Sequence, residues 1–152
     1  MIRLDGLGST RLLSYTCAGV ELSFSRPAGP IFIITPEVSR AIAYCEAHFA
    51  DPISVHDVAA AAHASVRKLQ EDFRICMATT PLAYLKSLRL HRAHQSLVAI
   101  ARGRGTGTVT EVAIQCGFSH LSRFAASYKD IYGYSPSETL RNGFSANLGA
   151  RQ

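Results

Sequence analysis

The sequence predicts an all-α protein in which two small helical subdomains of similar build are joined by a long helix. Three observations support this fold class. Apolar residues recur at helical spacing from residue 35 onward, Ser, Thr and Pro stand at the starts of these segments, and one pair of helices occurs twice. The 152 residues are 47% hydrophobic and 18% charged, which is enough apolar material for one domain or two very small ones.

The first 34 residues differ from the rest. Short β-rich runs occur at Leu12-Leu13, Val20–Phe24 and Ile31–Ile34, and a loop-like segment at 25–30 interrupts them. Two or three short strands cannot bury their faces alone. We therefore expect residues 1–34 to form a short irregular or β-like N-terminal arm, or the remnant of an upstream effector domain.

Three helices are predicted in the first subdomain. Thr35-Pro36 starts the first, because a hydroxyl cap followed by proline suits a helix N-terminus, and Asp51-Pro52 ends it. Ser54 opens a second helix that runs to about Ala62, and Ser65 opens a third. The residues expected to face inward are Val38, Ile42, Cys45 and Phe49 in the first helix, and Val66, Leu69 and Phe73 in the third.

A long linker helix follows. Thr80-Pro81 opens it, and helical periodicity continues over residues 81–101. A Gly- and Arg-rich connector at 102–107 then separates it from the second subdomain. The apolar face expected along this helix comprises Leu85, Leu88, Leu90, Ala93, Leu97 and Ile100.

The second subdomain is predicted to hold three more helices. Thr108 and Glu111 form a capping box that opens a helix to Cys116, and Gly117 ends it. Ser119 is expected to cap the next helix, which runs to about residue 131 and is ended by Gly133. The residues expected on its buried side are Leu121, Phe124 and Tyr128. A second capping box, Ser135-Pro-Ser-Glu138, opens a last short helix to about Asn142, and residues 144–152 are expected to fray.

An internal repeat is the strongest signal in the chain. Ser54–Ala59 matches Thr108–Ala113 at an offset of 54, whereas Thr80-Pro81 matches Ser135-Pro136 at an offset of 55. One residue is therefore inserted between the two helices of the second copy. Each copy reads as a short helix, a tight turn and a second helix, which is a helix-turn-helix at residues 54–76 and 108–131. The alternative is a pair of ordinary helical hairpins.

The two predicted turns differ in their glycine content. The second turn has Gly117, but the first, Ala62–Ser65, has His63 at the corresponding place. A left-handed turn residue is easy for glycine and strained for other residues. We therefore expect strain at His63 if the two turns have the same shape.

Positive charge is concentrated in the middle of the chain. The whole sequence has a formal net charge of +5. Residues 65–104 hold eight Lys and Arg against two Asp and Glu, a net +6, whereas residues 36–64 carry a net −3. A basic segment beside an acidic one is typical of a surface that faces phosphates. The alternative is a solvated helix face.

The second helix of each repeat offers side chains that can read base edges. Arg pairs with guanine, Gln with adenine, and Glu accepts a hydrogen bond from cytosine. The long helix spans roughly 30 Å, close to the ~34 Å between successive major grooves on one face of a duplex. The outward residues are Arg67, Lys68, Gln70, Glu71 and Arg74 in the first copy, and His120, Ser122, Arg123 and Lys129 in the second.

Two ordered sets of residues resemble the AraC/XylS-type DNA-binding domain. The first set is Ser65–Gln70, Phe73-Arg74, Thr80-Pro81, Tyr84-Leu85, Leu88–Leu90 and Ala93. The second set is Val112-Ala113, Gly117–His120, Arg123-Phe124, Tyr128-Lys129, Tyr132-Gly133 and Ser135–Arg141. The resemblance implies an all-α DNA-binding domain over residues 35–143, with two helix-turn-helix subdomains and reading helices at 65–76 and 119–131. One departure is Ala78, where the family usually has glycine.

The resemblance also implies a function. It points to a bacterial, cytoplasmic transcription regulator, most often an activator, that binds double-stranded DNA and contacts RNA polymerase. A small-molecule effector would enter only through an N-terminal domain absent here, so the chain is either a truncated piece or a short member. The residues that we expect at the DNA are Ser65, Arg67, Lys68, Gln70, Glu71, Arg74, Arg89, Ser119, His120, Ser122, Arg123 and Lys129.

Other classes of function find less support. No nucleophile elbow, P-loop or paired-carboxylate pattern is present, so we expect no enzyme and no cofactor. A DNA-repair alkyl acceptor would need a zinc-held cysteine cluster, and the four cysteines are far apart, typical of reduced core thiols. A helical protein-interaction module without specific DNA readout remains the alternative. The sequence shows neither a signal peptide nor an apolar run near the roughly 20 residues of a membrane helix.

Three further sets of residues have two interpretations each. His91 and His94 are three residues apart, but no third ligand is near, so a solvated face is expected rather than a metal site. Arg89 is expected either to contact a phosphate or to pair with Asp72 or Glu71. The residues expected to be core or subdomain contacts, rather than base-stacking groups, are Tyr84, Tyr128, Tyr132 and Tyr134.

Overall fold

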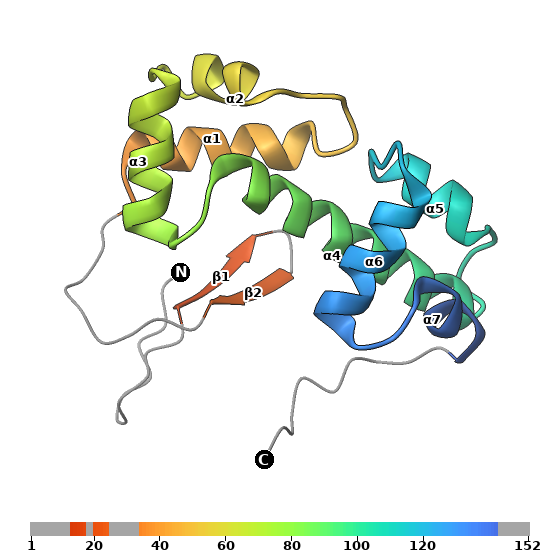
Figure 1. The fold of residues 1–152 in the computed structure, drawn as a ribbon. Helices are drawn as coiled ribbons and strands as arrows, with labels where there is room; N and C mark the ends of the chain where they lie inside the picture. Colours follow the sequence, from red (N-terminus) through yellow and green to blue (C-terminus); the bar gives the residue numbers. More distant parts are fainter. Residues whose placement is uncertain (1–12, 18–19, 25–33, 143–152) are drawn as a thin grey trace, which may run out of the picture.

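The computed structural model describes residues 13–17, 20–24 and 34–142, which contain two strands and seven helices (Figure 1). Strands β1 (Leu13–Cys17) and β2 (Val20–Phe24) form an antiparallel hairpin in which Leu13 pairs with Phe24. The β-like character predicted for the N-terminal arm is confirmed for these two runs. Of the third β-rich run, residues 31–33 lie outside the described residues, and Ile34 is not in a strand.

Helices α1 (Pro36–Ala47), α2 (Val55–Ala61) and α3 (Val66–Met77) surround the first hydrophobic core. Their starts confirm the predicted caps. The Thr35 side chain accepts a hydrogen bond from the amide of Val38, and Ser54 forms a reciprocal capping box with Asp57. Several side chains in this core are fully buried, namely those of Val38, Val58, Leu69 and Phe73.

Helices α5 (Val109–Gln115), α6 (Leu121–Tyr132) and α7 (Pro136–Asn142) surround a second core. Both predicted capping boxes are confirmed. The Glu111 carboxylate accepts from the amide of Thr108 at 2.7 Å, and the Glu138 carboxylate accepts from that of Ser135 at 2.6 Å. These boxes satisfy helix amides that would otherwise lack partners.

Helix α4 (Pro81–Ala101) covers the predicted range and connects the two cores. The prediction of one continuous apolar face is wrong. Its first half buries Tyr84, Leu85 and Leu88 in the first core, and its second half buries Leu90, Ala93 and Leu97 in the second. At about 100° per residue these two sets are centred on nearly opposite faces of the helix. Each subdomain therefore packs against its own side of α4.

The prediction that His91 and His94 lie on a solvated face of α4 is wrong. His94 is only 8% exposed, and its Nδ1 lies 2.6 Å from the hydroxyl of Tyr128, which in turn lies 2.8 Å from Oγ1 of Thr139. The His94 ring also stacks on Tyr132, with centroids 4.2 Å apart. His91 is half-buried. The interpretation as a solvated face was wrong because α6 and α7 cover this part of α4.

The predictions for tyrosines and cysteines are confirmed where the structure describes them. Tyr84 and Tyr128 are buried, and Tyr132 and Tyr134 pack against the second core. Three cysteines, Cys45, Cys76 and Cys116, are buried. Burial raises the pKa of Cys45 and of Cys116 to about 11, so both thiols are protonated near neutral pH.

Within the described ranges, no helix is both long and apolar enough to cross a bilayer. Across the same ranges, no group of three or more His, Cys, Asp or Glu side chains is arranged to hold a metal ion.

Candidate nucleic-acid interface

The two helix-turn-helix turns have the same backbone design. His63 in the first and Gly117 in the second both have a left-handed conformation, with φ of 56° and 78°. The next residue donates a 3.0 Å hydrogen bond back into the preceding helix in each copy, from Ala64 to Ala59 and from Phe118 to Ala113. The turn predicted from the repeat is therefore confirmed, and His63 carries the expected strain of about 1 kcal/mol.

Helix α3 has one buried and one polar face. Leu69 and Phe73 are fully buried, whereas the five residues predicted to face outward are exposed: Arg67, Lys68, Gln70, Glu71 and Arg74. The Ser65 hydroxyl accepts from the amide of Lys68 at 3.2 Å and so caps the helix. The side chains with base-reading chemistry are thus held on a rigid, capped helix.

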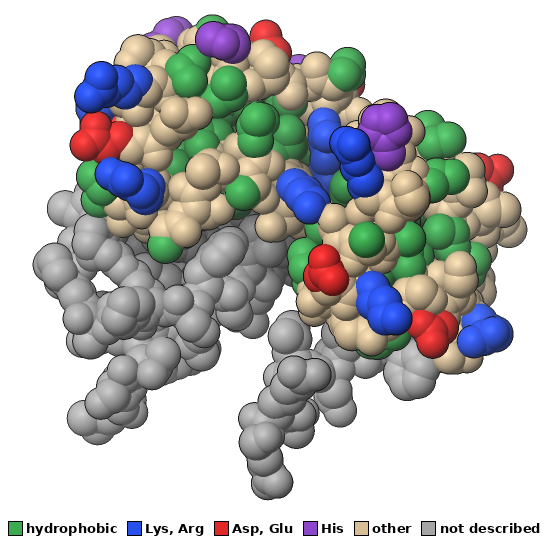
Figure 2. All heavy atoms as spheres, viewed as in Figure 1, with side chains coloured by type: hydrophobic (Ala, Val, Ile, Leu, Met, Phe, Trp, Pro, Cys, Tyr) green, Lys and Arg blue, Asp and Glu red, His purple; other side chains and the backbone are tan. Residues whose placement is uncertain are grey.

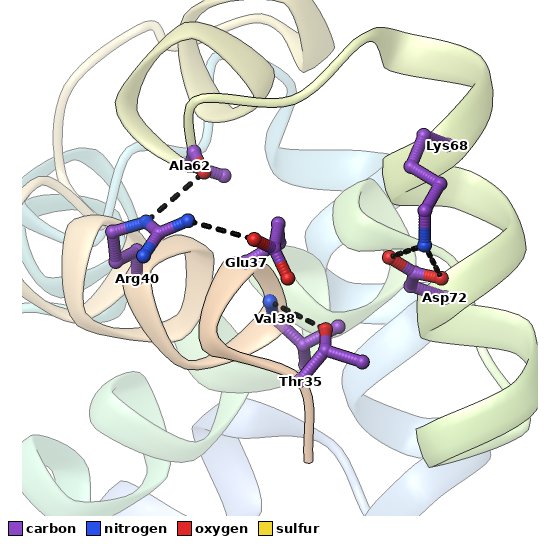
Figure 3. Close-up of polar contacts among 7 residues, drawn as sticks. All are labelled: Thr35, Glu37, Val38, Arg40, Ala62, Lys68 and Asp72. Carbon is purple, nitrogen blue, oxygen red and sulfur yellow. Dashed lines mark hydrogen bonds and ion pairs between the residues drawn. The ribbon is translucent and has the colours of Figure 1, made fainter.

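One of these basic side chains already has an acidic partner. The ammonium of Lys68 lies 2.5 and 2.7 Å from the two carboxylate oxygens of Asp72, which is only 6% exposed (Figure 3). The hydrogen bond that Lys68 donates to Asp72 raises the pKa of Lys68. The charge that α3 presents to a duplex therefore comes mainly from Arg67 and Arg74.

Arg40 holds the first turn in place, a role that local sequence patterns did not indicate. Its Nε donates to the carbonyl oxygen of Ala62, the last residue before the strained His63, at 3.0 Å (Figure 3). Its Nη2 forms an ion pair with Glu37 one turn earlier on α1, also at 3.0 Å. Helix α1 thereby fixes the end of α2 from which the turn to α3 departs.

Helix α6 starts later than predicted. Its N-cap is His120, whose side chain makes no capping hydrogen bond, so the cap assigned to Ser119 is wrong. The residue inserted in this copy lengthens the turn and moves the cap position from the serine to the histidine. Leu121, expected to be buried, is 42% exposed, whereas Phe124 and Tyr128 are buried as predicted. Exposed polar residues on this helix and its cap include His120, Ser122, Arg123 and Lys129.

Helices α3 and α6 lie on the same side of the molecule. In the view of Figure 1, α3 lies in front of α1, α6 lies in front of α4, and both run in a similar direction. On this side, Figure 2 shows Lys and Arg side chains over the α3 end and again over the half that holds α6. The geometry thus offers two separated basic, polar helices to one extended partner.

Arg89 lies away from both acidic residues proposed as its partners. Its Nε donates to the carbonyl oxygen of Phe49 and its Nη2 to that of Asp51, each at 2.6 Å. The prediction of an ion pair with Asp72 or Glu71 is therefore wrong, because the guanidinium is bound to the loop between α1 and α2. Its side chain is half-buried.

Two helix-turn-helix units on one long helix define a bipartite helix-turn-helix protein. Residues 58–142 match a protein-family model described as a helix-turn-helix domain. The probable thc operon regulatory protein of Rhodococcus erythropolis is 41% identical over 104 residues, which cover 68% of this chain and 31% of that protein. The XylDLEGF operon transcriptional activator 2 of Pseudomonas putida is 32% identical over 132 residues, covering 87% of this chain and 79% of that one.

Solved structures agree with these relatives. A probable AraC family transcriptional regulator from Rhodopseudomonas palustris superposes with a TM-score of 0.65 at 35% identity, covering 72% of this chain and 98% of that one. The DNA-binding domain of AdpA, solved with a target DNA, gives 0.60 at 25% identity, covering 70% and 96%. The chain belongs to the AraC/XylS family of transcription regulators. It spans about a third of the length of the first curated relatives that it matches.

Proposed function

We propose that this chain binds double-stranded DNA sequence-specifically, with α3 and α6 reading two adjacent segments of the major groove. The observation that carries the proposal is the presence of two exposed polar helices, each opened by the same kind of turn, on one side of the molecule. Second helices of helix-turn-helix units read base edges in this way. The likeness to the AdpA DNA-binding domain, which was solved with a target DNA, supports binding to DNA.

The exposed side chains divide by chemistry into base and phosphate contacts. Arg67 and Gln70 on α3 have the donors that recognise guanine and adenine, and Arg123 on α6 has the guanine-reading fork. The Glu71 carboxylate can accept a hydrogen bond from cytosine. The expected phosphate or supporting contacts are Ser65, Lys68, Arg74, Ser119, His120, Ser122 and Lys129. We do not include Arg89 among the DNA contacts, since two of its donors bind backbone carbonyl oxygens of the protein itself.

The distance between the reading helices has a consequence for the DNA. Helix α4 has 21 residues, so it is roughly 30 Å long at 1.5 Å per residue. Adjacent major grooves on one face lie about 34 Å apart in straight DNA. If the helices are held closer than this, the duplex bends toward the protein, at a cost on the order of 1–6 kcal/mol.

Relatives suggest the regulatory role. The Pseudomonas putida relative is named an operon transcriptional activator, which favours activation over repression. An activator acts in the cytoplasm and has RNA polymerase as a second partner. The first curated relatives extend well beyond the matched region, and we propose that any effector binds outside that region. We propose no catalysis for this chain.

Selection from random duplex DNA tests the proposal directly. The full chain should enrich sequences with two conserved segments about one helical turn apart. A salt titration on the selected site should give a slope of log K against log salt near −5 for about six phosphate contacts. No enrichment together with a flat salt response would favour the helical protein-interaction module.

A further inference from the structure

The loop between α1 and α2 contacts the second subdomain directly. Arg89 projects from the middle of α4 and donates to the carbonyl oxygens of Phe49 and Asp51 in this loop, both at 2.6 Å. Two short hydrogen bonds from one planar guanidinium fix the direction of the loop as well as its distance from α4. The loop is therefore attached at the place where α4 passes from the first core to the second.

The turn before α6 abuts this loop. A Cβ atom added to Gly117 would lie 2.8 Å from the carbonyl oxygen of Ala50 and 3.1 Å from Cζ and Nε of Arg89. Only a residue without a side chain fits there. The second helix-turn-helix turn is thus in contact with the backbone of the first subdomain and with the guanidinium that holds it.

Phe49 strengthens the same contact. Its ring packs against both hydrophobic cores, and the guanidinium of Arg92 lies over it, 5.6 Å from the ring centroid. We call the assembly of Phe49, Ala50, Arg89, Arg92 and Gly117 the junction. It connects the two subdomains through the backbone, through hydrogen bonds and through one shared aromatic ring.

We infer that the junction, with Arg89 as its positioning residue, sets the separation and rotation between α3 and α6 and so selects the spacing of the two DNA segments. This inference rests on the proposed function. The subdomains pack on nearly opposite faces of α4, so the helix itself does not hold one against the other. Without the junction, each subdomain could rotate about the axis of α4. One base pair of spacing corresponds to a shift of about 3.4 Å and a rotation of about 34° between the two DNA segments. An intact junction prevents the subdomains from moving by this amount, and a disrupted junction allows it.

Paired glycine variants test the inference. Gly117→Ala inserts a methyl group into the junction, and its matched control is Gly133→Ala. Gly133 has a similar φ, 81° against 78°, but a Cβ there meets nothing within 4 Å. Both variants carry the same backbone strain, and only the first disturbs the junction.

The measurement is binding to the selected DNA site with its spacer shortened by one base pair, unchanged, or lengthened by one or two. For the wild type and Gly133→Ala we expect a loss of roughly tenfold per base pair of change, as for a mismatch. For Gly117→Ala we expect the four probes to differ by less than about threefold, or the optimum to move. If Gly117→Ala keeps the wild-type spacing profile, the inference is wrong.

Arg89→Lys provides a second, independent variant in case Gly117→Ala does not fold, which circular dichroism would reveal. Lysine keeps the charge but cannot span two carbonyl oxygens. We expect a flattened spacing profile with an unchanged salt slope, whereas the exposed control Arg104→Lys should match the wild type. A preserved spacing profile in Arg89→Lys would contradict the inference. Absence of specific binding by the wild type would instead overturn the proposed function, and the inference with it.

Discussion

Ala50 and Gly117 are in backbone contact across the two subdomains, with the carbonyl oxygen of Ala50 only 2.8 Å from the position of a Cβ on Gly117. Glycine is therefore required at position 117 for two reasons, its left-handed φ and the close approach of the Ala50 carbonyl oxygen. Its counterpart His63 has the same kind of φ with an exposed side chain. The two turns share a conformation, but only the second is enclosed by its neighbours.

Arg67→Ala and Arg123→Ala should act on different DNA segments. Each arginine lies on the exposed face of one reading helix, so its loss should cost about 1–3 kcal/mol of binding and relax preference at one base pair. Selection with each variant measures which position changes. If both variants lost preference at the same base pair, or if Arg67→Ala weakened all sequences equally, the two-segment model would be wrong.

His120→Asp should raise stability while lowering DNA affinity. Helix α6 begins without a side-chain cap, and an N-cap carboxylate would satisfy its first amides, adding about 1 kcal/mol to the free energy of unfolding. The same negative charge would repel a phosphate at this helix end. Urea unfolding and binding titration measure the two effects.

His120→Ser is the matched control for that experiment. Serine caps as well as aspartate does but adds no charge, so it should give a similar gain in stability with a smaller loss of affinity. Equal affinity of the two variants would show that no phosphate lies near the start of α6.

Ala78→Gly should stabilise the first subdomain. Ala78 ends α3 in a left-handed conformation, φ 51°, where the equivalent residue of the second subdomain is Gly133. Glycine adopts this conformation without steric cost, so we expect a gain of about 0.5–1 kcal/mol in the free energy of unfolding. Thermal and urea unfolding check it. A loss of stability would mean that the entropy of the more flexible unfolded chain outweighs the relief of strain.

Stability should fall as the pH drops below about 6.5. Burial lowers the pKa of His94 from its ordinary 6.5, and neighbouring His91 acts in the same direction; burial also lowers the pKa of His91. Below about pH 6.5 the unfolded chain therefore binds more protons at these histidines than the folded chain does. The free energy of unfolding decreases as the pH falls from there. Urea unfolding between about pH 8 and pH 5 measures this.

His94→Gln identifies the group responsible. Glutamine can still hydrogen-bond to Tyr128 but does not titrate, so the pH dependence should become shallower. The same change at the exposed His56 is the control. The capping carboxylate of Glu138 has its pKa lowered by hydrogen bonds from Ser135, so its contribution is lost only below about pH 4.5. An unaltered slope in His94→Gln would assign the effect to other groups.

Local signals predicted most of the fold. Caps at Thr35, Ser54 and Thr108 lie within a few residues of the amides that they serve, so their effect is readable from the sequence. The prediction of Ser119 as the N-cap of α6 is wrong because the inserted residue lengthens the turn, which moves the cap position to His120. The change of offset from 54 to 55 shows that a residue is inserted, but it does not show at which position of the turn the insertion lies.

Tertiary contacts account for what the sequence did not predict. Arg40 and Arg89 both donate to backbone carbonyls, of Ala62 and of Phe49 and Asp51, and any residue can supply a carbonyl. No pattern in the sequence marks such partners. The burial of His94 depends likewise on α6 and α7, which are distant in the chain. The exposure of the base-reading candidates on α3 could be predicted from the sequence, because it follows from the helical periodicity of the buried Leu69 and Phe73.

The change of face along α4 makes its length a far stricter requirement than that of the connector after it. One residue inserted between Leu88 and Leu90 would turn the second subdomain by about 100° around the helix and shift it by about 1.5 Å. No adjustment of side chains restores such a rotation. An extra residue near the exposed Gly103 would merely enlarge a surface bend. Natural variation in length should therefore accumulate in the connector and be excluded from the middle of the helix.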